Sequence, residues 1–367
     1  MAAATALRGA LGWPLRHVKA ILHWVLVLAA LGYIAWQLPD MVAAVREAGD
    51  VLAEMSWGWL SVAVLLAVAA LLLYGELHRW MLVLGGTPVP GRTVQAITFA
   101  ENAISNTVPV VGGAGALAYS IARLRSRGVD AALASWSVFL PGALSTVILL
   151  VGGIVVIGAV GWMPLWFALV VAAAVVVGTM GFWAVLTHVS VLRRILLGLV
   201  HAWRRVPGLC RTCRGGWASD PEGTADRLAG RLGLLHPTMG QWGVLVVTAA
   251  ASWIADYLAL HAVAAAMGLS VPWTTLALGF LAVQLSIALQ ILPGGAGLAE
   301  TGLLGVLLAA GAPPAPAAAT VLIYRLITWL GLSLAGWVVY ATQIHLTPHH
   351  RHPAEPEHAL PPGTVPT

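Results

Sequence analysis

The sequence predicts an all-α polytopic membrane protein, with about six full transmembrane helices plus two re-entrant helical hairpins that form an inverted-topology repeat. Three observations support this fold class. The 367 residues are 59% hydrophobic and 9% charged, with a mean hydropathy of +0.87, whereas soluble domains are about 25% charged. Several apolar runs reach roughly the ~20 residues that a helix needs to cross a bilayer. Two further apolar stretches are broken by Pro and Gly in matching contexts.

The full crossings are predicted as helices, because backbone groups in hydrocarbon must form hydrogen bonds within their own segment. The first run lacks a small-residue cleavage site, so it is predicted to be a retained helix and not a signal peptide. We expect a cytoplasmic N-terminal segment at 1–20, one transmembrane domain at 21–344 and a Pro- and His-rich disordered cytoplasmic tail at 345–367. The predicted full helices are 21–38, 57–80, 131–160, 163–189, 239–267 and 315–342.

The distribution of basic residues predicts a multi-pass cell-membrane protein with both termini in the cytoplasm. Cytoplasmic loops of membrane proteins are enriched in Lys and Arg. With the N-terminus inside, every basic residue except Arg46 and Arg325 falls on the cytoplasmic side, including those of a basic loop at 190–237. This holds only if the stretch between Arg92 and Arg123 enters and leaves on that same side. The positive-inside rule also explains the pI of about 9.7, so no nucleic acid partner is expected.

The stretch at about 93–123 is predicted to be a re-entrant hairpin open to the cytoplasm. It is too short for two crossings, which need ~40 residues, and Pro109, Gly112 and Gly113 interrupt it. Non-helical backbone at membrane depth is tolerated where it is buried in protein or lines a wet cavity. A second hairpin is predicted at about 273–311, broken at 293–297 and open to the outside. Two short crossings are the alternative for this longer stretch.

The two broken stretches resemble each other. One reads NTVPVVGGAGALA and the other LQILPGGAGLAE, and each is followed by a half-helix that runs to a glycine, Gly128 or Gly311. Because the first hairpin opens inward and the second outward, the pair predicts an inverted-topology repeat. Secondary transporters built this way bind their substrates near the midplane, at broken helices. The alternative for any single glycine is close packing of helices by small residues.

Ionisable groups at bilayer depth are functional candidates, since each costs ~2.5–3.5 kcal/mol to insert. Arg325 is the only deep basic group, and Glu300 is the first choice for its partner, with Asp256 and Glu101 as alternatives. The pair could be structural or could bind substrate, because arginine suits bidentate capture of phosphate. Half-helix N-termini near Gly113 and Gly295 would add positive dipole ends. The candidate substrate-binding residues are Glu101, Asn102, Asn106, Pro109, Gly112, Gly113, Asp256, Gln290, Pro293, Gly294, Gly295, Gly297, Glu300, Tyr324 and Arg325.

Other chemistry is not expected. Cys210 and Cys213, even with His201 nearby, supply too few ligands for a structural zinc site, and no cofactor is predicted. No nucleotide-binding loop occurs, and no Ser-His or Cys-His arrangement lies at membrane depth. Glu76 is expected to pair with Arg79 one turn along the second helix.

The second-half motif carries a family resemblance. The pattern P-GG-x-G-x-x-E, a glycine about ten residues on and a Tyr-Arg pair resembles the lysylphosphatidylglycerol synthase transmembrane region, also called the flippase-like domain family. LHRW at 77–80 and SNTVPVVGG at 105–113 extend the resemblance to the first half, so that it covers about 21–340. Two features depart from the family: the segment 115–121 is uncharged, and the following helix reads SVFLPGAL. The residues that carry the second-half pattern are Pro293, Gly294, Gly295, Gly297, Glu300, Gly311, Tyr324 and Arg325.

The resemblance implies a flippase-like transmembrane domain without the soluble aminoacyl-transfer domain of the synthases. The expected function is translocation of an anionic or glycosylated phospholipid, or a polyprenyl-phosphate-linked lipid, between leaflets. A proton or ion gradient, or the lipid gradient itself, would drive it, with Glu101, Asp256 and Glu300 as proton carriers. Similar proteins also accompany lipid-modifying enzymes or glycosyltransferases. The alternatives are a membrane-embedded transferase or lipid hydrolase using Glu300 and Asp256 as acid and base, and an accessory scaffold for a membrane glycosyltransferase.

Overall fold

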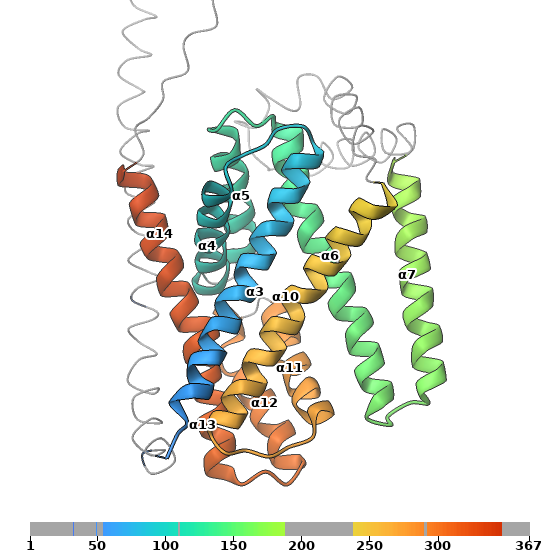
Figure 1. Cartoon of the computed structure of the whole chain (residues 1–367), viewed down its shortest axis with the longest axis vertical. Helices are drawn as coiled ribbons and strands as arrows, with labels where there is room; N and C mark the ends of the chain where they lie inside the picture. Colours follow the sequence, from blue (N-terminus) through green and yellow to red (C-terminus); the bar gives the residue numbers. More distant parts are fainter. Residues whose placement is uncertain are drawn as a thin grey trace, which may run out of the picture.

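The computed structural model (Figure 1) describes residues 32, 49, 54–108, 111–187, 238–289 and 292–346. Within these ranges every regular element is a helix and no strand occurs, which confirms the all-α prediction. The predicted helix at 21–38, apart from Gly32, lies outside the described residues, as do the basic loop 190–237 with Cys210 and Cys213, and the tail beyond 346.

Five helices of the described part are long and apolar enough to cross a membrane. They confirm five of the predicted full helices, and the second runs four residues further than expected, to Leu84. Together with the composition, they make this chain a multi-pass membrane protein. These spans are α3 (Trp57–Leu84), α6 (Ala131–Ala159), α7 (Leu165–Thr187, with the apolar span Leu165–Trp183), α10 (Met239–Ala266) and the composite helix Pro314–Thr342.

The two broken stretches form pairs of short helices. The first is α4 (Gly91–Thr107, 17 residues) and α5 (Gly112–Arg125, 14 residues). The second is α11 (Trp273–Ala288, 16 residues), the 3₁₀ turn η2 (Pro293–Gly295) and α12 (Leu298–Ala309, 12 residues). Each helix is shorter than the ~20 residues of a full crossing. In Figure 1, α4 and α5 lie beside the upper half of α3, whereas α11 and α12 lie at the lower end of the bundle.

Both pairs end in the same way. Gly128 after α5 and Gly311 after α12 have φ values of 87° and 82°, in the left-handed region that glycine tolerates best. In each case the next residue, Val129 or Ala312, donates its N–H to a carbonyl of the last helical turn, as in a Schellman C-cap. The predicted exit glycines are therefore confirmed as C-terminal stops of α5 and α12.

The last helix differs from the single continuous helix predicted at 315–342. It consists of α13 (Pro314–Arg325), a π-helical segment η3 (Leu326–Gly331) and α14 (Leu332–Leu346). A π segment widens the turn and is frequent at functional sites. Here it begins directly after Arg325 and carries Thr328 and Trp329, so the irregular backbone lies where the buried arginine does.

Small residues set the distance between α14 and α4. At Gly336 an added Cβ would overlap the carbonyl oxygen of Phe99 and lie 2.7 Å from the Cβ of Ala103. Similar close packing occurs between α3 and α10, where Ala63, Ala67 and Ala249 are fully buried. Such contacts let helices approach in a membrane, where packing provides much of the driving force for association.

We expect Gly336→Ala to destabilise the protein by about 1–3 kcal/mol, because the backbone of α4 cannot move aside as a flexible side chain would. The measurement is the midpoint of thermal unfolding in detergent micelles. The control is Gly305→Ala in α12, where an added Cβ meets no atom within 4 Å. A Gly336→Ala variant as stable as Gly305→Ala would contradict the close approach.

Candidate functional site

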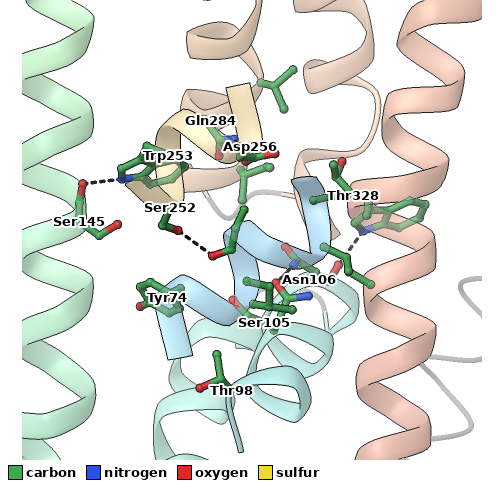
Figure 2. Close-up of a pocket in the computed structure, with 18 of the residues that line it drawn as sticks. Tyr74, Thr98, Ser105, Asn106, Ser145, Ser252, Trp253, Asp256, Gln284 and Thr328 are labelled. Atoms are coloured by element: carbon green, nitrogen blue, oxygen red, sulfur yellow. Dashed lines mark hydrogen bonds between the residues drawn. The ribbon is translucent and has the colours of Figure 1, made fainter. Parts of the chain in front are cut away.

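A cavity of about 430 Å³ lies in the middle of the bundle, between the two broken stretches. Figure 2 shows its wall, to which α3, α4, α6, α10 and α11 contribute, together with α13 and η3. The volume is within the range of small-molecule sites, but the wall is more polar than in most of them. Hydroxyl, amide and carboxyl groups face one another in a bundle that is otherwise apolar, among them Tyr74, Asn102, Ser145, Thr146, Gln284 and Thr328.

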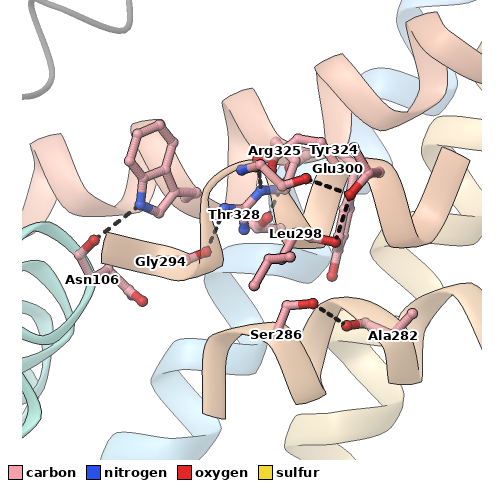
Figure 3. A network of polar contacts seen from close by, with 12 residues as sticks. Asn106, Ala282, Ser286, Gly294, Leu298, Glu300, Tyr324, Arg325 and Thr328 are labelled. Carbon is pink, nitrogen blue, oxygen red and sulfur yellow. Dashed lines mark hydrogen bonds and ion pairs between the residues drawn. The ribbon is translucent and has the colours of Figure 1, made fainter. Parts of the chain in front are cut away.

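Arg325 is the centre of one buried network (Figure 3). Its Nε donates to Oε1 of Glu300 at 2.6 Å, and its Nη2 donates to the carbonyl of Gly294 at 2.5 Å. The side chain is only 2% exposed, and its guanidinium carbon lies 5.5 Å from the centre of the Trp329 ring, a cation–π distance. The predicted pairing of Arg325 with Glu300 is confirmed.

Glu300 also caps the helix in which it lies. Its Oε2 accepts the backbone N–H of Gly297 at 2.6 Å, which satisfies a free donor at the start of α12. One carboxylate thus joins the guanidinium to the N-terminus of α12, while the same guanidinium holds the Gly294 carbonyl at the break. The network fastens the second broken stretch to α13.

This geometry bears on the predicted capture of phosphate by Arg325. Bidentate recognition uses two adjacent guanidinium nitrogens as a fork. In this conformation Nε and Nη2 are occupied by Glu300 and Gly294, so that edge is closed to a ligand. The arrangement favours the structural role of the pair, although Arg325 still lies on the cavity wall.

Asp256 forms a second network and does not pair with Arg325. Its Oδ1 accepts from the Tyr324 hydroxyl at 2.9 Å, and its Oδ2 accepts from Nε2 of Gln284 at 3.0 Å. The carboxyl therefore connects α10, α11 and α13 through one donor for each oxygen. Neutral donors of this kind reduce the unfavourable free energy of burying a carboxyl group.

Glu101 lies at the opposite side of the cavity, among α3, α4 and α5. Its Oε2 accepts from Ser120 at 2.7 Å, and Nδ1 of His78 is 3.9 Å from the same oxygen. The His78 nitrogen is also 3.4 Å from the hydroxyl of Thr98.

The predicted ion pair between Glu76 and Arg79 is confirmed, with 2.5 Å between Oε2 and Nε. Both side chains are about one-third exposed, so this pair lies nearer the surface.

The two breaks approach each other through Trp329. Its indole N–H donates to the carbonyl of Asn106 at the end of α4, and a Cβ added to Gly294 would overlap the same indole nitrogen. The Asn106 amide donates to Asn102 at 2.9 Å. One side chain of the π segment therefore contacts both broken stretches.

The structure divides the predicted site residues into two groups. Glu101, Asn102, Asn106, Asp256, Tyr324 and Arg325 lie on the cavity wall. The other predicted site residues within the described ranges are not on that wall and lie at the two breaks. They are Gly112, Gly113, Pro293, Gly294, Gly295, Gly297 and Glu300. The half-helix α12 starts after Gly297, two residues later than predicted. Pro109 and Gln290 lie outside the described residues.

Sequence reasoning missed the wall residues of the full helices. Tyr74, Ser145, Ser252, Gln284 and Thr328 are uncharged polar residues in largely apolar helices, and residues of this kind often bond to their own helix. His78, in the LHRW segment, was also missed. It is not on the wall but lies against Glu101, and its ring could have been suspected on the membrane-depth argument alone. Within the described ranges no group of three or more His, Cys, Asp or Glu side chains could hold a metal ion.

Comparison with protein families adds an independent finding. The sequence model described as the lysylphosphatidylglycerol synthase TM region matches residues 16–336. This range contains both broken stretches and every described residue of the cavity wall. Comparison with curated proteins finds no match. The chain thus belongs to the family of the lysylphosphatidylglycerol synthase transmembrane region, and so to a group of membrane proteins connected with lipids.

Proposed function

We propose that this protein moves a lipid between the two leaflets of the membrane, with the polar headgroup passing through the central cavity. The substrate would be an anionic or glycosylated phospholipid, or a polyprenyl-phosphate-linked lipid. The observation that carries the proposal is the cavity itself, since hydrogen-bonding groups from seven elements gather between two helix breaks. Polar groups inside a membrane protein mark substrate pathways because they are otherwise costly there.

The size of the cavity supports a headgroup passage more than a site for a whole lipid. A volume of about 430 Å³ suits a headgroup-sized ligand, while acyl chains can remain in the surrounding bilayer. The wall offers donors and acceptors in place of the water that the headgroup loses. Asn102 is well placed for this role, because its Nδ2 is buried and has no hydrogen-bond partner among the described residues.

We also propose that the two broken stretches are re-entrant hairpins related by an inverted repeat, with both termini in the cytoplasm. Their opposite positions in the bundle support this arrangement, as do the matching exit glycines. A further likeness lies at the tips. Gly112 passes close to the carbonyl of Ser105, and Gly295 passes close to the backbone of Ser286 and Ile287. Each return arm thus uses a glycine to approach the outgoing arm.

The proposed passage can be tested by placing a larger side chain in the cavity. Gly142 of α6 lies on its wall, and an added Cβ would be 3.5 Å from the Tyr74 hydroxyl, an ordinary contact. We expect Gly142→Leu to reduce translocation of fluorescent lipid analogues at least tenfold in proteoliposomes, because the isobutyl group occupies the headgroup path. Gly142→Ala is the matched control and should retain the wild-type rate. Equal rates for a folded Gly142→Leu variant would contradict the passage.

The geometry favours transport over lipid chemistry. The alternative acid–base pair would be Glu300 and Asp256, but Glu300 is committed to Arg325 and to the α12 cap. Only Asp256 of the two lies on the cavity wall. The same proteoliposomes distinguish the remaining alternatives. Mass spectrometry of their lipids would reveal a transferase or hydrolase, and a scaffold for a glycosyltransferase would leave lipids unmoved as well as unchanged.

A further inference from the structure

Glu101 of α4 is one of the three proton carriers expected from the sequence, and the structure places it in a buried cluster. The other members are His78 of α3, Thr98 of α4 and Ser120 of α5. Glu101 is 9% exposed and His78 is 3% exposed. The Glu101 carboxyl accepts one described hydrogen bond, from Ser120, and the histidine nitrogen lies 3.9 Å away. The other ring nitrogen of His78, Nε2, is buried and has no hydrogen-bond partner among the described residues.

This environment compensates a negative charge less well than those of the other embedded acids. Glu300 has the guanidinium of Arg325, and Asp256 has a separate donor for each oxygen. No described Lys or Arg forms an ion pair with Glu101. A carboxylate buried with one hydroxyl donor is costly, and a bound proton removes that cost. Imidazole is the one ordinary side chain that exchanges protons between about pH 5 and 8.

The groups around the pair are otherwise neutral donors, acceptors or apolar residues. From α3, Tyr74 and His78 face Glu101, and their rings lie 4.8 Å apart. From α5, Ser120 faces it, and α14 carries Tyr340, which packs on Tyr119 of α5. The 3₁₀ turn η2 is Pro-Gly-Gly and brings no titratable group. Across the cavity, Arg325 is already paired with Glu300.

Glu101 lies on the cavity wall, and its side chain is 11% exposed, so water that enters the cavity can reach it. A proton from cavity water can bind a Glu101 oxygen or a His78 ring nitrogen and can leave to cavity water again. Since the two groups interact, the proton belongs to the pair and not to either residue alone. The position matters for transport, because each binding event changes by one unit the charge that a headgroup meets.

We propose that Glu101 and His78 form a proton-binding site that couples lipid movement to a proton gradient. The proton binds when the cavity faces one side of the membrane and leaves when it faces the other. The coupling rests on the proposed transport function, whereas proton binding by the pair does not. A first measurement therefore addresses the proton alone, and a second addresses the coupling.

The first measurement is pH-dependent infrared difference spectroscopy of the full chain in lipid nanodiscs. We expect a C=O band of a protonated carboxyl group that is lost in Glu101→Gln and retained in Glu76→Gln, whose carboxyl is one-third exposed and paired with Arg79. His78→Gln and Ser120→Ala, which each remove one neighbour, should shift the pH midpoint of this band. A band unchanged in Glu101→Gln, or a midpoint insensitive to His78→Gln, would overturn the proton site.

The second measurement is the pH profile of lipid translocation in proteoliposomes. In the wild type a single controlling proton changes the rate up to about tenfold for each pH unit beyond the midpoint, and an imposed pH gradient should accelerate movement in one direction. Glu101→Gln should flatten the profile and abolish the response to the gradient. If the infrared band behaves as expected but the wild-type profile is flat, the coupling is overturned. If no lipid moves at any pH, the transport proposal itself fails while the proton site stands.

Discussion

Replacing Arg325 by alanine is expected to lower the free energy of unfolding by about 3 kcal/mol and to abolish lipid translocation. This is the lower end of the range for removing one partner of a buried ion pair, because Arg325 is 2% exposed but its partner Glu300 is 33% exposed. The substitution leaves Glu300 without its counter-ion and the Gly294 carbonyl without its donor. Because these two contacts fasten the second broken stretch to α13, the break should lose its fixed geometry and the adjacent cavity should lose its shape.

The chain contains a matched control for this experiment. Arg79 and Glu76 form an ion pair between the arginine Nε and a carboxylate oxygen at nearly the same distance. Glu76 and Glu300 are equally exposed, at 33%, but Arg79 is 34% exposed whereas Arg325 is 2% exposed. Exposed pairs contribute only about 0–1 kcal/mol, so Arg79→Ala should be nearly neutral. Thermal unfolding in detergent compares the two variants. Equal unfolding midpoints, with normal translocation by Arg325→Ala, would contradict the role assigned to the buried pair.

Arg325→Lys refines the test, because it keeps the charge while removing the planar fork. A lysine ammonium can reach Glu300 or the Gly294 carbonyl, but it cannot hold both in the observed geometry. We expect its stability to fall between those of the wild type and Arg325→Ala. The difference between Lys and Ala then measures what a long cationic side chain contributes without the planar fork.

Much of the architecture could be predicted from the sequence because membranes impose simple constraints. The described full helices follow from apolar length, and the broken stretches follow from Pro and Gly where a helix would otherwise continue. The pairing of Arg325 with Glu300 was predictable for a related reason. A lone deep cation needs a carboxylate, and few carboxylates lie at membrane depth.

The composition of the cavity wall could not be predicted in the same way. In soluble helices a polar face and an apolar face identify the buried side, but α6 and α7 have no distinct polar face. A serine such as Ser145 therefore gives no sign of the direction in which it points. The contact of Asp256 with Gln284 and Tyr324 joins three helices distant in sequence, and no local pattern encodes it.

The π segment was missed for a different reason. Leu326–Gly331 contains no proline and reads as an ordinary apolar helix, with its only glycine at the end. The widened turn is favoured by tertiary contacts, since Trp329 reaches the Asn106 carbonyl and packs against Gly294. Local preference is overridden where both breaks meet the last helix. The same contacts place Thr328 on the cavity wall.

The second large effect is expected at Gly295, in the break of the second stretch. Its φ of 69° is one that alanine adopts at a cost of about 1–3 kcal/mol. An added Cβ would also lie 2.9 Å from the carbonyl carbon of Ser286 and 3.0 Å from the nitrogen of Ile287. Overlap with a fixed backbone adds about 1–3 kcal/mol, so Gly295→Ala should destabilise by about 2–6 kcal/mol and stop translocation.

Two other glycines separate these contributions. Gly297 has a φ of 81° and no atom within 4 Å of an added Cβ, so Gly297→Ala measures backbone strain alone. Gly112 lies in a regular helix, where an added Cβ would be 2.6 Å from the Ser105 carbonyl oxygen, so Gly112→Ala measures overlap alone. If glycine is required at Gly295 for both reasons, the unfolding midpoint of Gly295→Ala should fall further than that of Gly297→Ala or Gly112→Ala. A Gly295→Ala variant no less stable than Gly297→Ala would mean that the return arm can move away from α11, and the close approach at the tip would then not be what fixes the break.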